Sequence, residues 1–156
     1  MMKLAGKLLV AAAVAVTAGL SPALADDFEK PIKARKAQMQ LYAWNISTLG
    51  AMAKGAIPYD AEAAQAAANN LAALTKIGTA AMWPPGSDST ALPGKTRSKA
   101  EMWTTYPAVA ENGKQMAMAA AKMAEVAGNG LEAVQGQIKA VGGACGACHK
   151  KYREEK

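Results

Sequence analysis

The chain has few of the residues that usually bind metal ions. It contains one histidine and two cysteines in 156 residues, and all three lie within Cys145–His149. A structural zinc site usually takes four Cys or His ligands, so this composition argues against one. No alternation of apolar and polar residues indicates a β-strand. The net charge of +6 comes without a basic stripe interleaved with aromatic residues, so nucleic acid is not an expected partner.

The scarce residues that are present form one motif, Cys145-Gly146-Ala147-Cys148-His149. C-x-x-C-H is the attachment sequence for a c-type haem. Residues three and four apart on a helix share a face, so both thiols and the imidazole can reach one porphyrin. A disulfide is one alternative, and a thioredoxin-like redox pair, which needs a βαβ context, is another. The motif predicts one covalently bound haem c with His149 as the proximal axial ligand of its iron.

The N-terminus has the pattern of a secretory signal peptide. A lysine-containing start precedes the apolar run Leu8–Leu20 and the A-x-A cleavage site Ala23-Leu24-Ala25. An uncleaved anchor is the alternative, but the run is short against the ~20 residues of a membrane span. We expect cleavage of residues 1–25 to leave a single domain, 26–156, in a bacterial periplasm with no membrane insertion. Cleavage would remove two lysines with the signal peptide, so the net charge of the chain would fall from +6 to +4.

Helix-forming residues dominate the remaining chain, and apolar residues recur at helical spacing. The pattern predicts four helices joined by mostly short connections, with one long surface loop at 79–97. The helices span about 27–54, 61–77, 98–127 and 131–153. Four amphipathic helices of this kind favour an all-α, antiparallel four-helix bundle. Both cysteines fall on the apolar face of the last helix, so we expect the haem between the helices, near the C-terminal end of that helix.

Local signals refine these helix boundaries. Asp60 is the expected N-cap of the second helix. Ser98 and Glu101 have the spacing of a capping box for the third helix. Pro107 falls inside the third helical pattern, so we expect a kink or a break there with a short helical turn before it.

Several segments, together with the position of the haem motif near the C-terminus, resemble class II cytochromes c, the cytochrome c′ family. The resemblance covers nearly the whole mature chain, and its last segment is the most specific. It implies one covalent haem in a helical bundle, and often a homodimer formed through the first two helices. The matching segments are Ala34-Arg35-Lys36, Gly50–Gly55 with Pro58-Tyr59-Asp60, Glu101-Met102-Trp103 and Val141–Arg153.

The resemblance implies that Met39, four residues after Arg35, faces the distal side of the haem. Most family members carry an apolar non-ligand there, and their high-spin, five-coordinate iron takes NO or CO. A smaller branch carries methionine as the sixth ligand of a low-spin iron, and this sequence resembles that branch. We therefore predict Met39 as the distal axial ligand. A core methionine is the alternative, and spacing alone leaves Met116, Met118 and Met123 as rivals.

Two arginines are candidate haem contacts. Arg35 lies on the apolar face between Ile32 and Met39, where a charge needs a partner. A haem propionate suits bidentate contact with a guanidinium, and the alternative is an arginine that snorkels to solvent. The resemblance also implies that Arg153, four residues after His149, lies close to the proximal haem face. Arg153 would equally suit the helix dipole.

Together these features predict a periplasmic protein that transfers single electrons through a low-spin iron held by His149 and Met39. The alternative is a high-spin cytochrome c′ that binds NO or CO at an open distal site, with Met39 only blocking that side or displaced by ligand. A peroxidase normally has a distal acid–base group, and the chain has no second histidine, so we expect no enzymatic activity. Expected partners are periplasmic or membrane-bound redox proteins, with a homodimer as a further candidate.

Overall fold

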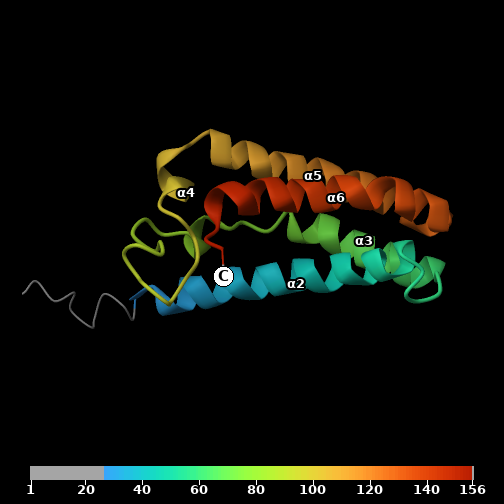
Figure 1. Ribbon diagram of the computed structural model, residues 1–156, viewed down its shortest axis with the longest axis horizontal. Coiled ribbons are helices and arrows are strands. Elements are labelled where there is room, and N and C mark those ends of the chain that lie inside the picture. The colour runs from blue at the N-terminus through green and yellow to red at the C-terminus, as the bar shows by residue number, and fades with distance from the viewer. Residues whose placement is uncertain (1–26, 156) are drawn as a thin grey trace, which may run out of the picture.

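The computed structural model describes residues 27–155, so the predicted signal peptide lies outside the described residues. Four long helices run alongside one another, each antiparallel to the next along the chain (Figure 1). Helices α2 and α5 each pack against both α3 and α6. The predicted antiparallel four-helix bundle is confirmed, and residues 27–155 contain no β-strand. The long helices are α2 (Glu29–Ala53), α3 (Ala61–Leu74), α5 (Ala108–Val126) and α6 (Leu131–Tyr152).

Two of the predicted local signals determine helix boundaries. Asp60 caps α3, because its Oδ1 accepts a hydrogen bond from the backbone N–H of Ala63 at 2.7 Å. Pro107 lies between the short helix α4 (Glu101–Thr104) and α5, as the residue that immediately precedes α5. Proline cannot continue a helix because it lacks the N–H donor. The predicted cap at Asp60 and the predicted break at Pro107 are therefore both confirmed.

The predicted capping box at Ser98 and Glu101 is wrong. The residue that precedes α4 is Ala100, and no side chain caps this helix. Ser98 instead forms an isolated antiparallel β-bridge with Arg153, just after α6. The backbone of Ser98 thus pairs with a distant segment, and its side chain does not cap the helix that follows it in the sequence.

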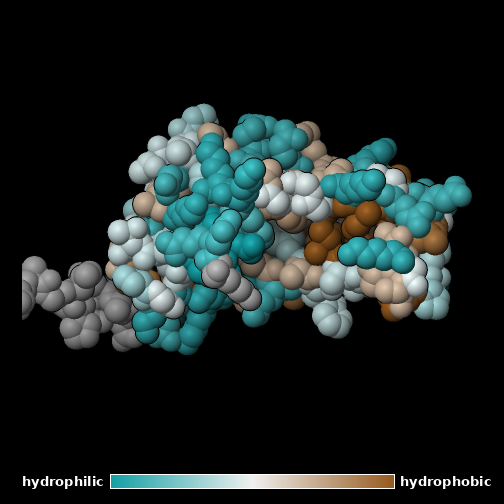
Figure 2. Space-filling model, in the orientation of Figure 1, coloured by the Kyte–Doolittle hydropathy of each residue, from teal (hydrophilic) through white to brown (hydrophobic). Residues whose placement is uncertain are grey.

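Apolar side chains from all four long helices form the core. α3 contributes Ala64, Ala67 and Ala68, whose small side chains let the neighbouring helices approach closely. Figure 2 shows apolar side chains between α2 and α6 in the half of the bundle away from the long loop. No helix within residues 27–155 has the length and apolar character needed to cross a membrane. The largest fully buried apolar side chains are Leu49, Leu71, Met123, Val134 and Val141.

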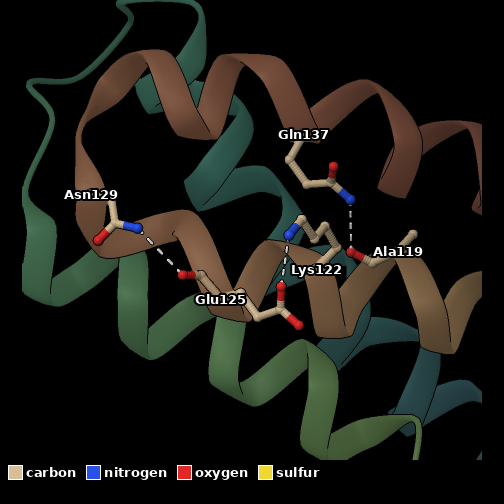
Figure 3. A network of polar contacts seen from close by, with 5 residues as sticks. All are labelled: Ala119, Lys122, Glu125, Asn129 and Gln137. Carbon is tan, nitrogen blue, oxygen red and sulfur yellow. Dashed lines mark hydrogen bonds and ion pairs between the residues drawn. The ribbon is translucent and has the colours of Figure 1, made fainter.

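One polar contact joins α5 to α6 in the same half of the bundle (Figure 3). Gln137 Nε2 on α6 donates to the carbonyl oxygen of Ala119 on α5 at 3.1 Å. The nearby ion pair of Lys122 with Glu125, at 2.8 Å, lies within α5 and is exposed. Exposed pairs of this kind contribute little to stability, and only the hydrogen bond of Gln137 crosses from α6 to α5 among the contacts that Figure 3 draws.

The long connection between α3 and α4 folds back onto the bundle. It begins with the 3-10 helix η1 (Ala80–Met82) and has no other helix before α4. The predicted loop at 79–97 is therefore present, but Ser87, Ser89, Leu92 and Thr96 within it are buried. Buried hydroxyl groups need hydrogen-bond partners, and these partners come from α2 and from the segment after α6.

We predict that Asp60→Ala lowers the free energy of unfolding by ~1 kcal/mol, because alanine offers no acceptor to the first turn of α3. Asp60→Asn is the matched control, since its side-chain oxygen can accept the same bond. Urea denaturation of the haem-loaded protein, followed by circular dichroism, measures both variants. Equal destabilisation by alanine and asparagine would contradict the assigned cap.

Candidate haem site

The three residues of the C-x-x-C-H motif line one cavity inside the bundle. Cys145, Cys148 and His149 lie on one face of α6, and each is partly buried. The cavity has a volume of about 350 Å³ and also has walls from α2, α5 and the end of α3. The helical spacing of the motif has thus brought two thiols and one imidazole to a single space, as one covalent haem requires.

Methionines also line this cavity. Met39 lies on α2, and Met116 lies on α5, where its Sδ is 3.7 Å from Cys145 Sγ. The other two rivals for the distal position lie elsewhere, because Met118 is 57% exposed on the surface and Met123 is fully buried in the core. Met39 therefore shares the cavity with His149 but comes from a different helix. Met116 contacts a cysteine of the motif itself.

The chemistry of these groups fits a haem. Burial lowers the pKa of His149, and the charges of Arg153 and Arg97 lower this pKa further. A lowered pKa keeps the imidazole neutral, which is the form that binds iron. Burial raises the pKa of both thiols, at Cys145 and Cys148, so neither is poised as a free thiolate ligand.

A bare metal ion fits the site less well. Among residues 27–155, no three His, Cys, Asp or Glu side chains come together to hold one. The cavity lining is otherwise mostly apolar, with Tyr42 and Ile46 from α2 and Leu74 from α3. An apolar cavity with one neutral imidazole and two adjacent thiols suits a porphyrin that brings its own four iron ligands.

Arg35 lies close to the cavity, but its guanidinium is turned toward the long loop. Its Nη1 donates to Ser87 Oγ at 2.7 Å, and its Nη2 donates to Thr96 Oγ1 at 2.9 Å. The guanidinium carbon lies 4.7 Å from the ring centroid of Trp83, and Trp83 lines the cavity. Arg35 is only 2% exposed, so the alternative of an arginine that snorkels to solvent is wrong.

The predicted contact of Arg35 with a haem propionate needs one correction. Each terminal nitrogen already makes two hydrogen bonds, the further acceptors being the backbone oxygens of Met82 and Ser87. A bidentate fork to a propionate is therefore not available in this arrangement. The charge nevertheless has no carboxylate partner within residues 27–155, and burial lowers the pKa of the guanidinium. A propionate nearby would supply the missing negative charge, so an electrostatic role toward the haem stays a prediction.

Arg153 follows α6 directly and is exposed. Its backbone N–H donates to the carbonyl oxygen of His149 at 3.0 Å, and its positive charge adds to the lowering of the pKa of His149 by burial. This position agrees with the predicted place near the proximal face, and a contact with haem stays a prediction. Arg153 is also the C-cap residue of α6, so a favourable interaction with the helix dipole is available as well.

Sequence reasoning gave no role to Trp83, which the structure places in the cavity wall. Its ring lies 6.3 Å from the ring of Trp103, tilted by 55°, and the Trp103 Nε1–H donates to the Trp83 carbonyl oxygen at 3.0 Å. No local signal in the sequence indicated that Trp83 lines the cavity, because its ring packs beside Arg35, which is far away along the chain.

Comparison with known proteins agrees with this site. The family description Cytochrome C′ matches residues 30–153, so the chain belongs to the cytochrome c′ family. It is 40% identical to cytochrome c-554 of Cereibacter sphaeroides over 143 residues, which covers 86% of this chain and 89% of that protein. It is 37% identical to cytochrome c′ of Allochromatium vinosum, over 91% of this chain and 88% of that protein.

A solved structure extends the comparison to three dimensions. It is a cytochrome c′ described as having an unusual ligand-controlled dimer dissociation. The two chains share 34% identity and superpose with a TM-score of 0.75, over 88% of this chain and all of the other. This likeness confirms the cytochrome c′ four-helix bundle.

Family membership confirms part of what the sequence predicted. The protein is a c-type haem protein of a bacterial periplasmic family, and its cofactor is a covalently attached haem c with iron. The low-spin, methionine-ligated branch is not confirmed. Relatives named cytochrome c′ fit the alternative prediction, a gas-binding haem, better than they fit an electron carrier.

We predict that the double variant Cys145→Ser, Cys148→Ser carries no covalently bound haem, because both thioether bonds are lost. Haem staining on a denaturing gel and the mass of the intact chain measure this in cells that mature c-type cytochromes. Met116→Leu is the matched control, since it removes the sulfur that touches Cys145 and should keep the haem. A wild-type chain with a Cys145–Cys148 disulfide and no bound haem would contradict the assignment.

Proposed function

We propose that the protein carries single electrons in the periplasm, with His149 and Met39 as the axial ligands of a low-spin haem iron. The observation that most supports the pair of axial ligands is that Met39 on α2 and His149 on α6 line the same cavity. The bound haem supplies the one-electron redox chemistry. A thioether is a soft, neutral ligand that favours reduced iron, and His/Met ligation raises the reduction potential.

The lining of the cavity supports electron transfer rather than catalysis. Apart from His149 and the two thiols of the haem motif, its polar side chains are neutral amides and hydroxyl groups such as Gln38, Tyr42 and Asn112. None of the lining residues is an Asp, Glu, Lys or Arg. General acid–base catalysis needs a titrating group within reach of the reacting atoms, so we propose that the protein is not an enzyme.

A second function is supported by the comparisons, which favour it over the first. Several of the matched relatives are named cytochrome c′, and one solved cytochrome c′ is described as having a ligand-controlled dimer dissociation. On this second proposal the iron is high-spin and binds NO or CO, with Met39 blocking the distal side or displaced from it. Met39 is 38% exposed and unbranched, so its side chain can change conformation to admit a small ligand.

The two functions predict different spectra for Met39→Leu, a substitution that nearly conserves side-chain volume. For an electron carrier, the reduced wild type shows sharp split bands and does not respond to CO, whereas the variant becomes high-spin and binds CO. Visible spectra of both proteins, oxidised, reduced and reduced with CO, measure this. Met116→Leu, the other methionine of the cavity, should keep the wild-type spectra. A wild type that binds CO, with a spin state unchanged in Met39→Leu, would favour the second function.

We also propose that the protein forms a homodimer through the outer face of α2. Leu41 and Trp44 lie three residues apart on this helix, and they are 52% and 72% exposed. Residues at this spacing share a face, and large exposed apolar groups that lie together are typical of interaction sites. The solved relative that dimerises is 34% identical to this chain, so a second copy is the occupant that we propose for this face.

We predict that Trp44→Lys shifts the protein from dimer to monomer, because a buried charge without a partner opposes association. Sedimentation velocity of the haem-loaded protein over a range of concentrations measures the change. Met118→Lys is the control, since Met118 is 57% exposed but lies on α5. A wild-type monomer at every concentration, or a dimer disrupted only by Met118→Lys, would contradict this interface.

A further inference from the structure

The spacing of α2 and α6 is fixed differently at the two ends of the bundle. At the end away from the long loop, Gln135 Nε2 on α6 donates directly to the carbonyl oxygen of Ala53 on α2 at 2.9 Å. At the other end the cavity lies between Met39 on α2 and His149 on α6. Contacts that run around the cavity can add to the spacing that a bound haem sets between α2 and α6 there.

A continuous set of hydrogen bonds joins the two helices around the cavity. It begins on α2 with Arg35, whose Nη2 donates to Thr96 Oγ1 at 2.9 Å. Thr96 Oγ1 also accepts from the backbone N–H of Ser98 at 3.2 Å. Ser98 then pairs with Arg153 in the isolated β-bridge. The loop therefore connects α2 to the segment that follows the haem motif.

Two backbone hydrogen bonds make up this β-bridge, and the side chain of Arg97 adds to them. The backbone N–H of Lys99 donates to the carbonyl oxygen of Tyr152 at 2.9 Å. The backbone N–H of Glu154 donates to the carbonyl oxygen of Arg97 at 2.9 Å, and the Arg97 guanidinium donates to the carbonyl oxygen of Glu154. We name the whole set the clasp, formed by Arg35, Ser87, Thr96–Lys99 and Tyr152–Glu154.

Both ends of the clasp lie one helical turn from a proposed axial ligand. Met39 is four residues after Arg35 on α2, and His149 is four residues before Arg153 at the end of α6. Arg35 and Met39 lie on the same side of α2, because residues four apart share a face of a helix. Arg153 lies just after the last residue of α6, and its backbone N–H donates to the carbonyl oxygen of His149 at 3.0 Å. A contact that fixes Arg35 and the segment at Arg153 therefore also fixes the two helix segments that face each other across the cavity.

We propose that Arg35 is a positioning residue, which holds α2 and the haem-bearing end of α6 at a fixed spacing through the clasp and so keeps Met39 within reach of the iron. The clasp is independent of the proposed function, whereas its effect at Met39 rests on that function. The role differs from the predicted propionate contact, because it depends on the loop oxygens and not on the haem.

The chemistry of arginine suits this role. Four acceptors on Met82, Ser87 and Thr96 surround its two terminal nitrogens, and its guanidinium carbon lies 4.7 Å from the ring centroid of Trp83. Ser87 is fully buried, so water cannot replace the guanidinium as a donor. A lysine ammonium is a compact point charge that cannot form the same planar fork. Loss of Arg35 would leave several buried acceptors without partners, which is costly.

Hydrogen exchange of the haem-loaded protein tests the clasp with Arg35→Gln and Thr96→Val. The backbone amides of Ser89, Lys99 and Glu154 report on the clasp. They donate hydrogen bonds to the carbonyl oxygens of Ser98, Tyr152 and Arg97, which all belong to it. In Arg35→Gln we expect them to exchange at least ~10-fold faster. Thr96→Val should have a smaller effect of the same kind, and it carries the test if Arg35→Gln does not fold.

Lys33→Gln is the matched control, since it removes one positive charge from the same helix but contacts Glu29 rather than the loop. Its exchange should equal that of the wild type. Faster exchange at Ser89 with no change at Glu154 would overturn the link to the C-terminal segment. No change at any of the three amides in either variant would overturn the clasp itself.

A second readout tests the consequence at Met39. In the reduced, haem-loaded Arg35→Gln protein, we expect the fraction that binds CO to rise several-fold over Lys33→Gln. Faster exchange without any change in CO binding would overturn the positioning of Met39 while leaving the clasp supported. If the wild type already binds CO fully, the proposed electron-carrier function fails, and the exchange rates still decide whether the clasp exists.

Discussion

The site depends on one geometric constraint, which is that the face of α6 carrying the haem motif points into the bundle. Val141 and Tyr152 lie on that face with the cysteines, and both are almost fully buried. Their burial turns α6 so that Cys145, Cys148 and His149 open into the interior rather than toward solvent. The helices α2 and α5 then become cavity walls, which is why a methionine on α2 can face a histidine on α6.

Where the cavity lies, the side chains of α2, α5 and α6 line a space and make fewer contacts with one another. The end away from the loop keeps an apolar core and direct polar links, such as Tyr59, whose hydroxyl donates to the carbonyl oxygen of Ala127 at 2.8 Å. The cavity end instead has a folded loop with buried hydroxyl groups and one buried guanidinium. Polar groups in such places specify a unique arrangement only when all of them have partners, and no buried side-chain polar atom in the described residues lacks one.

Features governed by neighbouring residues could be predicted from the sequence, and features governed by distant ones could not. The cap at Asp60 and the break at Pro107 follow from local chemistry, and both are present. The capping box at Ser98 failed because its backbone pairs with Arg153 instead. For Arg35, the apolar pattern around it predicted a buried charge that needs a partner.

The partners of Arg35 lay beyond sequence reasoning. They are Ser87 and Thr96, which are 52 and 61 residues away along the chain. The position of Trp83 in the cavity wall depends on the same distant contact. The placement of Met39 came from the resemblance to a family rather than from periodicity, because several methionines share a helical spacing.

A crystal structure of the oxidised, haem-loaded protein would show which side chains bind the iron. We expect one haem in the cavity, bonded to Cys145 and Cys148, with a His149 nitrogen and the Met39 sulfur on opposite sides of its iron. A haem in this cavity with no protein ligand on the distal side would contradict the electron-carrier account and support gas binding. A haem outside the cavity would contradict the assignment of the site itself.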